Sequence, residues 1–298
     1  MPGPRYRLVA VDLDGTLIDH RGRVAEEDLA ALREARDAGI VVTICTGRAL
    51  VECREIIERL EQTDPVIVSG GALVACPSTG RTIERFTLPP ELVGEVAAFL
   101  HARGRPIVLL KDSHAARYDY LAVSPDGPGS LDIASTWWFE HMKASVRHAR
   151  SIEADEHPHD TIRLGAYQAN RPIVELAAEL REAFSAVTAQ QHFDGVLLPS
   201  NPAGGVGMTS VHIVELFDPK ACKGQALARL ADDLGIPLEE TAAIGDQTND
   251  LSMIRAAGLG IAMGNAHPDV HAAARRRTGS VGAGGVATAI RNVLSGEW

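Results

Sequence analysis

Residues 8–11 form a short apolar run that stops abruptly at Asp12-Leu13-Asp14-Gly15, and this junction constrains the fold more than any other feature. A strand without polar residues on either face is buried on both sides, as in the parallel sheets of α/β proteins. Ligands of such sheets collect where the strands end in loops. The run therefore predicts a parallel strand whose carboxyl end carries two acidic side chains.

Asp12 and Asp14 have the spacing that places two side chains on one face of a strand. Neighbouring carboxylates repel each other unless a cation or a shared proton lies between them, and Mg²⁺ prefers oxygen ligands. We therefore expect Mg²⁺ at this edge of the sheet. The alternative for so short a motif, taken alone, is a solvated acidic turn. A calcium-binding EF-hand loop is excluded because Gly15 comes too early in it.

Both ends of the chain alternate apolar strand-like runs with segments of helical periodicity, the pattern of a doubly wound parallel sheet in an α/β protein. The expected strands after the first are 40–45, 66–68, 241–244 and 259–263. The expected helices are 24–38, about 48–60, 223–234, 246–257 and 285–294, and Arg275-Arg276-Arg277 is expected at a solvated helix end.

The middle of the chain lacks this alternation, and its strands are expected to be scattered and shorter. We interpret residues 84–216 as an α+β domain inserted into a core made of residues 1–83 and 217–298. Trp137-Trp138-Phe139 is expected in the core of the inserted domain, or as a surface that stacks on a sugar or heterocycle.

Four polar loops are expected to meet at one edge of the core sheet: Asp12-Leu13-Asp14, Thr46-Gly47-Arg48, Lys223-Gly224 and Asp246-Gln247-Thr248-Asn249-Asp250. Together they supply a carboxylate nucleophile, a second carboxylate, a hydroxyl, a lysine and further acids for a cation. Phosphoryl transfer through an aspartyl-phosphate requires this set, because the enzyme positions the phosphate and stabilises its charge.

With these four motifs in this order, the chain resembles the haloacid dehalogenase (HAD) superfamily of phosphatases over essentially its whole length. More narrowly, it is similar to the Cof-type branch (type IIB), in which a large α+β cap follows the third strand of a Rossmann-like core. It departs from that branch at Gly70-Gly71, where members often have Asn-Gly.

The resemblance implies that Asp12 attacks phosphorus and that Asp14 serves as general acid and then base. The residues expected to be catalytic are Asp12, Asp14, Thr46 and Lys223. The residues expected to bind phosphate or substrate are Thr46, Gly47, Arg48, Lys223 and Asn249. The residues expected to hold Mg²⁺ are Asp12, Asp14 (through its backbone carbonyl), Asp246 and Asp250, although Asp250 could equally orient Lys223.

The implied function is a Mg²⁺-dependent phosphomonoesterase for a small phosphorylated metabolite, with a sugar phosphate first and a phosphorylated cofactor next. Two alternatives stay open: a phosphomutase that uses the same aspartyl-phosphate, and a sensor that binds a phosphorylated ligand without catalysis.

Composition narrows the possible partners. A net charge of −10 over 298 residues disfavours nucleic acid. No apolar stretch approaches the roughly 20 residues of a membrane helix, and the N-terminus lacks the apolar segment of a secretory signal. The four cysteines form no Cys-x-x-Cys pair, which is typical of a reducing compartment. We expect a cytoplasmic monomer or small homo-oligomer.

Overall fold

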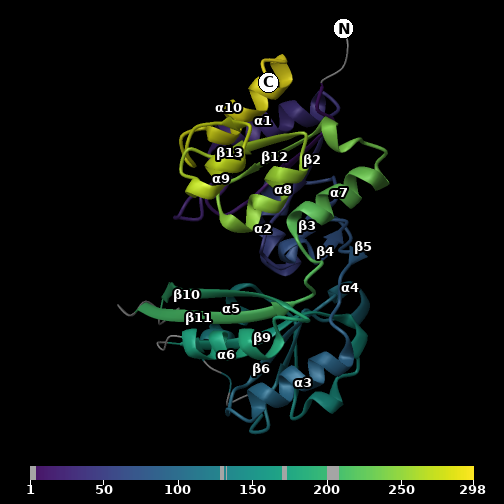
Figure 1. Cartoon of the computed structure of the whole chain (residues 1–298), viewed down its shortest axis with the longest axis vertical. Helices are drawn as coiled ribbons and strands as arrows, with labels where there is room; N and C mark the ends of the chain where they lie inside the picture. Colours follow the sequence, from purple (N-terminus) through teal and green to yellow (C-terminus); the bar gives the residue numbers. More distant parts are fainter. Residues whose placement is uncertain (1–4, 128–130, 132, 170–172, 200–207) are drawn as a thin grey trace. The chain divides into compact units, whose positions relative to one another are not determined.

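The computed structural model describes residues 5–127, 131, 133–169, 173–199 and 208–298. The chain forms two compact units, one of Met1–Glu84 with Lys220–Trp298 and one of Arg85–Pro219 (Figure 1). We call them unit 1 and unit 2. The assignment of residues 1–83 and 217–298 to a catalytic core and of 84–216 to a cap stays a proposal.

The described part of unit 1 contains a five-stranded sheet in the order β14-β13-β12-β1-β2, and every neighbouring pair in it is parallel. Its strands are β1 (Leu8–Val11), β2 (Val41–Ile44), β12 (Thr241–Gly245), β13 (Leu259–Ala262) and β14 (Arg276–Arg277). Segments from both ends of the chain, purple and yellow-green in Figure 1, thus share one sheet. The predicted α/β class with a parallel core sheet is confirmed.

The helices of unit 1 are α1 (Glu26–Asp37), α2 (Arg54–Arg59), α7 (Lys223–Asp233), α8 (Leu251–Ala256), α9 (Pro268–Ala273) and α10 (Gly285–Ser295). Helices α7, α8 and α9 share a buried apolar cluster with Leu8, Ala10 and Ala243 of the sheet. Helix α1 packs against α10. This packing holds α7, α8 and α9 against the sheet.

Unit 1 also contains a small sheet in the order β3-β4-β5, whose last residue is the first residue of unit 2. Its strands are β3 (Val66–Val68), β4 (Leu73–Ala75) and β5 (Thr82–Arg85). The Thr46 N–H donates to the carbonyl of Ile67 at 2.9 Å, so the loop after β2 is anchored on β3.

The described part of unit 2 contains a six-stranded sheet in the order β10-β11-β9-β6-β7-β8. Its strands are β6 (Ile107–Lys111), β7 (Tyr120–Val123), β8 (Val146–Ala149), β9 (Thr161–Ala169), β10 (Ala189–Pro199) and β11 (Met208–Phe217). Its helices are α3 (Pro90–His101), α4 (Ser113–Ala116), α5 (Ile133–His141) and α6 (Val174–Phe184).

Helices α3 and α6 share the main apolar cluster of unit 2 with one face of its sheet. Trp137 and Trp138 of α5 are half-buried and pack against Val211 and Ile213 of β11. Phe139 is buried, so this cluster contributes to the packing of unit 2 as predicted. Stacking of a ligand on the two tryptophans stays a prediction.

Two expectations about secondary structure are wrong. Three strands of unit 2 are long rather than short, since β9, β10 and β11 have 9, 11 and 10 residues. Arg276 and Arg277 are not at a helix end but form β14, since backbone bonds to Gly260 and Ala262 add this segment to the edge of the parallel sheet. Within the described residues, no helix is long and apolar enough to cross a membrane.

Candidate active site

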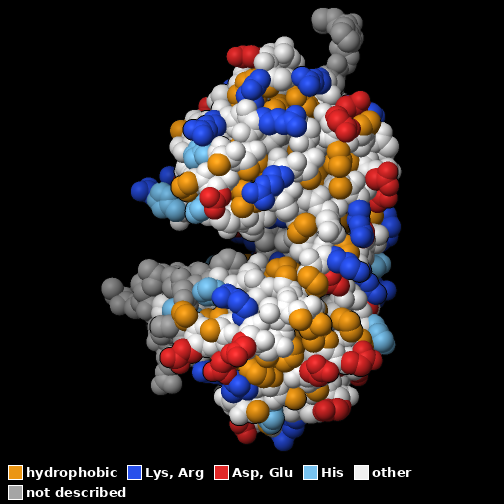
Figure 2. Space-filling model, in the orientation of Figure 1, with side chains coloured by type: hydrophobic (Ala, Val, Ile, Leu, Met, Phe, Trp, Pro, Cys, Tyr) orange, Lys and Arg blue, Asp and Glu red, His pale blue; other side chains and the backbone are white. Residues whose placement is uncertain are grey.

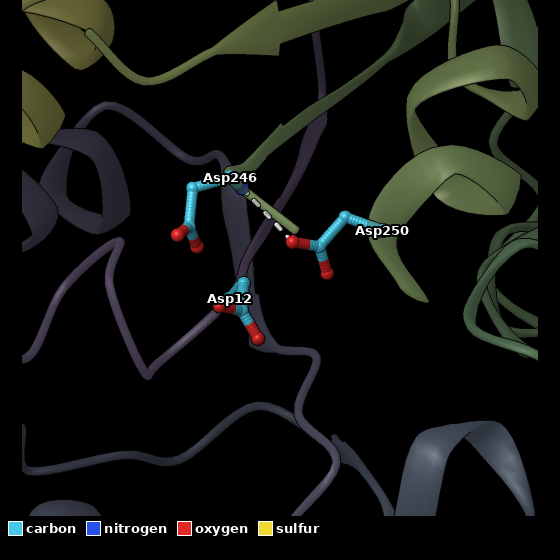
Figure 3. Close-up of side chains that lie close together, drawn as sticks. All are labelled: Asp12, Asp246 and Asp250. Atoms are coloured by element: carbon cyan, nitrogen blue, oxygen red, sulfur yellow. Dashed lines mark hydrogen bonds between the residues drawn. The ribbon is translucent and has the colours of Figure 1, made fainter. Parts of the chain in front are cut away.

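Three buried carboxylates lie together where β1 and β12 end (Figure 3). Asp12 directly follows β1 and Asp246 directly follows β12, and the two strands pair in parallel. Asp250 closes a 3₁₀ turn that leads into α8. One oxygen from each carboxylate lies within 4.8 Å of the others. In the described part of the chain, this is the one group of three or more His, Cys, Asp or Glu side chains that could hold a metal ion.

Lys223, the first residue of α7, lies against this cluster. Its Nζ donates to Oδ1 of Asp12 and to Oδ1 of Asp250, each at 2.6 Å, and its side chain is 1% exposed. If all three carboxylates are ionised, one ammonium leaves two negative charges uncompensated. Buried charges without partners are costly, so this donor set fits a divalent cation.

The pKa values reflect this excess of negative charge. Burial and the nearby Asp250 and Asp246 carboxylates raise the pKa of Asp12 to about 8, although Lys223 opposes the shift. Burial likewise raises the pKa of Asp246. Burial lowers the pKa of Lys223, but its bonds to Asp12 and Asp250 outweigh burial and the net shift is upward. A bound cation would favour the ionised form of each carboxyl.

Asp250 has little capacity left for a metal. Its Oδ2 accepts the backbone N–H groups of Asp246 and Gln247, each at 2.9 Å, and its Oδ1 accepts Lys223. These bonds shape the loop that carries Asp246 and fix the position of the lysine. Of the two roles expected for Asp250, the geometry favours the orientation of Lys223.

The Asp14 carboxylate is not part of the cluster. It is 55% exposed and accepts two bonds from Arg48, Nε to Oδ2 at 2.8 Å and Nη2 to Oδ1 at 2.5 Å. The expectation that the side chains of Asp12 and Asp14 face one ligand is wrong. Side chains two residues apart share a face only within a strand, and β1 ends at Val11, before both residues. A metal contact through the backbone carbonyl of Asp14 stays a prediction.

The phosphate-binding residues expected from the sequence come from neighbouring loops. Thr46 is buried, and its Oγ1 accepts the N–H of Arg48 at 3.2 Å. A Cβ placed on Gly47 would lie 3.8 Å from Nδ2 of Asn249, so the second and fourth motifs are adjacent. The structure thus brings Thr46, Gly47 and Asn249 close to one another, and their contacts with phosphate stay a prediction.

Sequence reasoning missed several residues that shape this site. Thr16 is fully buried and donates to Oδ1 of Asp246 at 2.9 Å. A Cβ on Gly71, whose φ is +98°, would lie 2.4 Å from the backbone carbonyl of Cys222, so only glycine allows the loop after β3 to approach α7. The local signals were the threonine that follows Asp14-Gly15 and the paired glycines at 70–71.

Comparisons with known proteins identify the family to which the chain is similar. A family model described as haloacid dehalogenase-like hydrolase matches residues 9–290. Phosphatase YwpJ of Bacillus subtilis (strain 168) is 32% identical over 305 residues, which cover 97% of this chain and 100% of that protein. The 5-amino-6-(5-phospho-D-ribitylamino)uracil phosphatase YwtE of the same organism is 27% identical, covering 98% and 99%. A solved haloacid dehalogenase-like hydrolase from B. subtilis is 28% identical with a TM-score of 0.71, covering 97% and 100%.

Proposed function

Because the chain belongs to the haloacid dehalogenase-like hydrolase family, we propose that it is a Mg²⁺-dependent phosphomonoesterase that works through an aspartyl-phosphate on Asp12. The family predicted from the four motifs is confirmed, and with it the hydrolase class. The observation that carries the proposal is the buried cluster of Asp12, Asp246 and Lys223, in which two carboxylates and an ammonium lie together.

Asp12 is the nucleophile in this proposal. Its Oδ1 is held by Lys223, which leaves Oδ2 for the attack on phosphorus. The Lys223 ammonium also neutralises charge on the phosphoryl oxygens as the bond to the leaving oxygen breaks. Thr46 and the backbone N–H groups that follow it would donate to the remaining phosphoryl oxygens.

Mg²⁺ would be held by Asp12, Asp246 and the backbone carbonyl of Asp14, and when bound it would supply charge neutralisation to the nucleophile and the phosphoryl group. The fit rests on the all-oxygen donor set and on the two uncompensated charges described above. Asp250 would act by fixing Lys223 and the Asp246 loop.

Asp14 would protonate the leaving oxygen and then activate the water that hydrolyses the aspartyl-phosphate. Its carboxylate is bound by Arg48 in this structure, so it must leave the guanidinium before it can reach a leaving group. A phosphate ester that competes for Arg48 would release Asp14, and Arg48 would then bind the substrate.

The substrate proposed is a small phosphorylated metabolite, with a sugar phosphate in first place. The name of one relative contains a phosphorylated ribityl group, which is a sugar alcohol. On the face drawn in Figure 2, described side chains of both charges are interspersed over each unit. Such a surface suits a small substrate whose negative charge is neutralised by groups within the site. Four free thiols agree with the proposed cytoplasmic location, and a monomer or small homo-oligomer is still expected.

Phosphate release from a panel of sugar phosphates, nucleotides and cofactor phosphates tests the proposal. Release should require Mg²⁺, stop in EDTA and be abolished by Asp12→Asn. Asp37→Asn is the matched control, since it makes the same change at an exposed position on α1. An isomerised sugar phosphate instead of free phosphate would point to a phosphomutase. Ligand binding without turnover would point to a sensor.

A further inference from the structure

Asn265 lies in the loop that follows β13, and its side-chain amide connects three loops around the carboxylate cluster. We propose that Asn265 is a positioning residue that holds Asp246 and the turn after Asp12 in the arrangement that binds the metal ion. This inference rests on the proposed function in one respect, namely that the metal ion is the Mg²⁺ that the proposed phosphatase would use.

The amide donates in two directions. Nδ2 lies 2.8 Å from the backbone carbonyl of Gly15 and 3.4 Å from Oδ2 of Asp246. On its other side, Oδ1 accepts the backbone N–H of Val281 at 2.8 Å. One short side chain thus ties the first Asp loop to the Asp246 loop and braces both against the segment before α10.

Asn265 completes a set of donors around a single carboxylate. Oδ1 of Asp246 accepts Thr16 at 2.9 Å, and Oδ2 accepts Gln247 at 3.2 Å in addition to Asn265. Hydrogen bonds of this kind fix how a ligating carboxylate points, and their loss weakens metal binding. Thr16 and Asn265 also connect that carboxylate to the turn after Asp12, so they set the separation of the two expected ligands.

The chemistry demands an amide at this position. Val281 supplies a donor, so the atom facing it must be an acceptor, whereas Gly15 and Asp246 supply acceptors, so the atom facing them must be a donor. An aspartate of the same shape satisfies Val281 but sets a carboxylate oxygen against a carbonyl and against Asp246. This mismatch repels the metal carboxylate rather than holding it.

The segment around Val281, which donates to Asn265, is itself anchored to the rest of unit 1. The segment that contains Val281 leads into α10, where the backbone N–H of Ala287 donates to Oδ1 of the buried Asp28 at 2.7 Å. Asn265 is exposed, so its replacement opens no cavity in the core. A variant at this position should therefore fold, and its metal affinity can be measured on folded protein.

The test is calorimetric titration of the metal-free protein with MgCl₂, without substrate, for the wild type, Asn265→Asp and Asn265→Ala. We expect Asn265→Asp to weaken Mg²⁺ binding by about 10- to 100-fold, the range found when a partner of a metal ligand is lost. Asn265→Ala, which removes the donor without adding a charge, should weaken it less. Asn292→Asp on α10 is the control for the added charge and should bind as the wild type does.

Circular dichroism confirms that each variant is folded before titration. Folded Asn265→Asp and Asn265→Ala with dissociation constants within twofold of the wild type would overturn the proposal, as would a loss of thermal stability without a loss of metal affinity. Because the titration needs no phosphate ester, its result stands even where the phosphatase assay fails. A failed Asn265 test likewise leaves the phosphatase proposal untouched.

Discussion

Replacing Lys223 by Met removes the ammonium that lies between two buried carboxylates. Its Nζ is 2.6 Å from both Asp12 and Asp250, and the three side chains are 1%, 6% and 0% exposed. Methionine fills a similar volume, so the change is mainly one of charge. The variant keeps both acids in place and leaves them without their partner.

The cost follows from burial. Removing one partner of a buried ion pair destabilises a protein by about 3–5 kcal/mol, because the remaining charge stays desolvated. In Lys223→Met this cost must depend on pH. The folded-state pKa of Asp12 lies well above its unfolded value of about 3.9 and rises further without the ammonium, so the folded variant binds a proton that the unfolded chain releases. The variant is therefore most stable near pH 4 and loses stability as the pH rises, and its deficit relative to the wild type widens where Asp12 of the wild type ionises, near pH 8.

Urea unfolding in EDTA at pH 5 and pH 8, followed by circular dichroism, measures this effect. Lys111→Met is the matched control, since Lys111 is equally buried and its Nζ pairs with Asp155 at 2.5 Å in unit 2. Both variants should lose stability, but Mg²⁺ should restore it only in Lys223→Met, where the cation replaces the lost positive charge. Phosphate release by Lys223→Met should fall by about 10²–10³-fold. Wild-type stability of Lys223→Met in EDTA at pH 8 would refute the reasoning.

Three further outcomes are expected. Since burial raises the pKa of Asp12 to about 8 without metal, Mg²⁺ binding must displace a proton, and its calorimetric affinity should increase from pH 6 to pH 8; an affinity independent of pH would contradict this. Gly71→Ala should lower the urea midpoint and phosphate release far more than Gly39→Ala. At Gly39 the positive φ costs about 1–2 kcal/mol, but an added Cβ meets no atom within 4 Å. Equal effects of the two substitutions would refute the close approach of Gly71 to Cys222. Burial raises the pKa of Asp28, so the stabilising contribution of this carboxyl is full near pH 4 and is lost as the pH rises. Asp28→Asn should therefore raise the urea midpoint at pH 7 and leave it unchanged near pH 4.

The parallel core was predictable because its strands carry their own signal. The runs that became β1 and β12 are apolar on both faces, and each ends in a loop with an aspartate. Helical connections leave such strands few arrangements, so the sequence alone places Asp12 and Asp246 at one edge of the sheet. Lys223 could be predicted at the same edge because it is the first residue of α7, the helix that packs on the same strands.

The strands of unit 2 were harder to predict because their polar residues are buried in pairs. Glu215 of β11 is 8% exposed and accepts Arg163 of β9 at 3.1 Å. His212 is buried at 7% between the apolar Val211 and Ile213. In a sequence, polar residues are interpreted as surface positions, so these buried ones interrupt the apolar pattern expected of long antiparallel strands.

The fine geometry of the site depends on contacts between distant parts of the chain. Thr16 meets Asp246 across 230 residues, and Asn265 meets Gly15 across 250. The pairing of Asp14 with Arg48 follows from the turn after β1, not from strand spacing. Residue spacing fixes only local neighbours, so these three contacts required the structure.

The central claim is that Asp12 carries the phosphoryl group. The most direct measurement mixes the enzyme and Mg²⁺ with a hydrolysed ester labelled in its phosphate, quenches in acid within milliseconds and counts the label on protein. The account predicts label on the peptide that contains Asp12, released by hydroxylamine and absent from Asp12→Asn. Unlabelled wild-type protein at every quench time, together with undiminished phosphate release by Asp12→Asn, would contradict it.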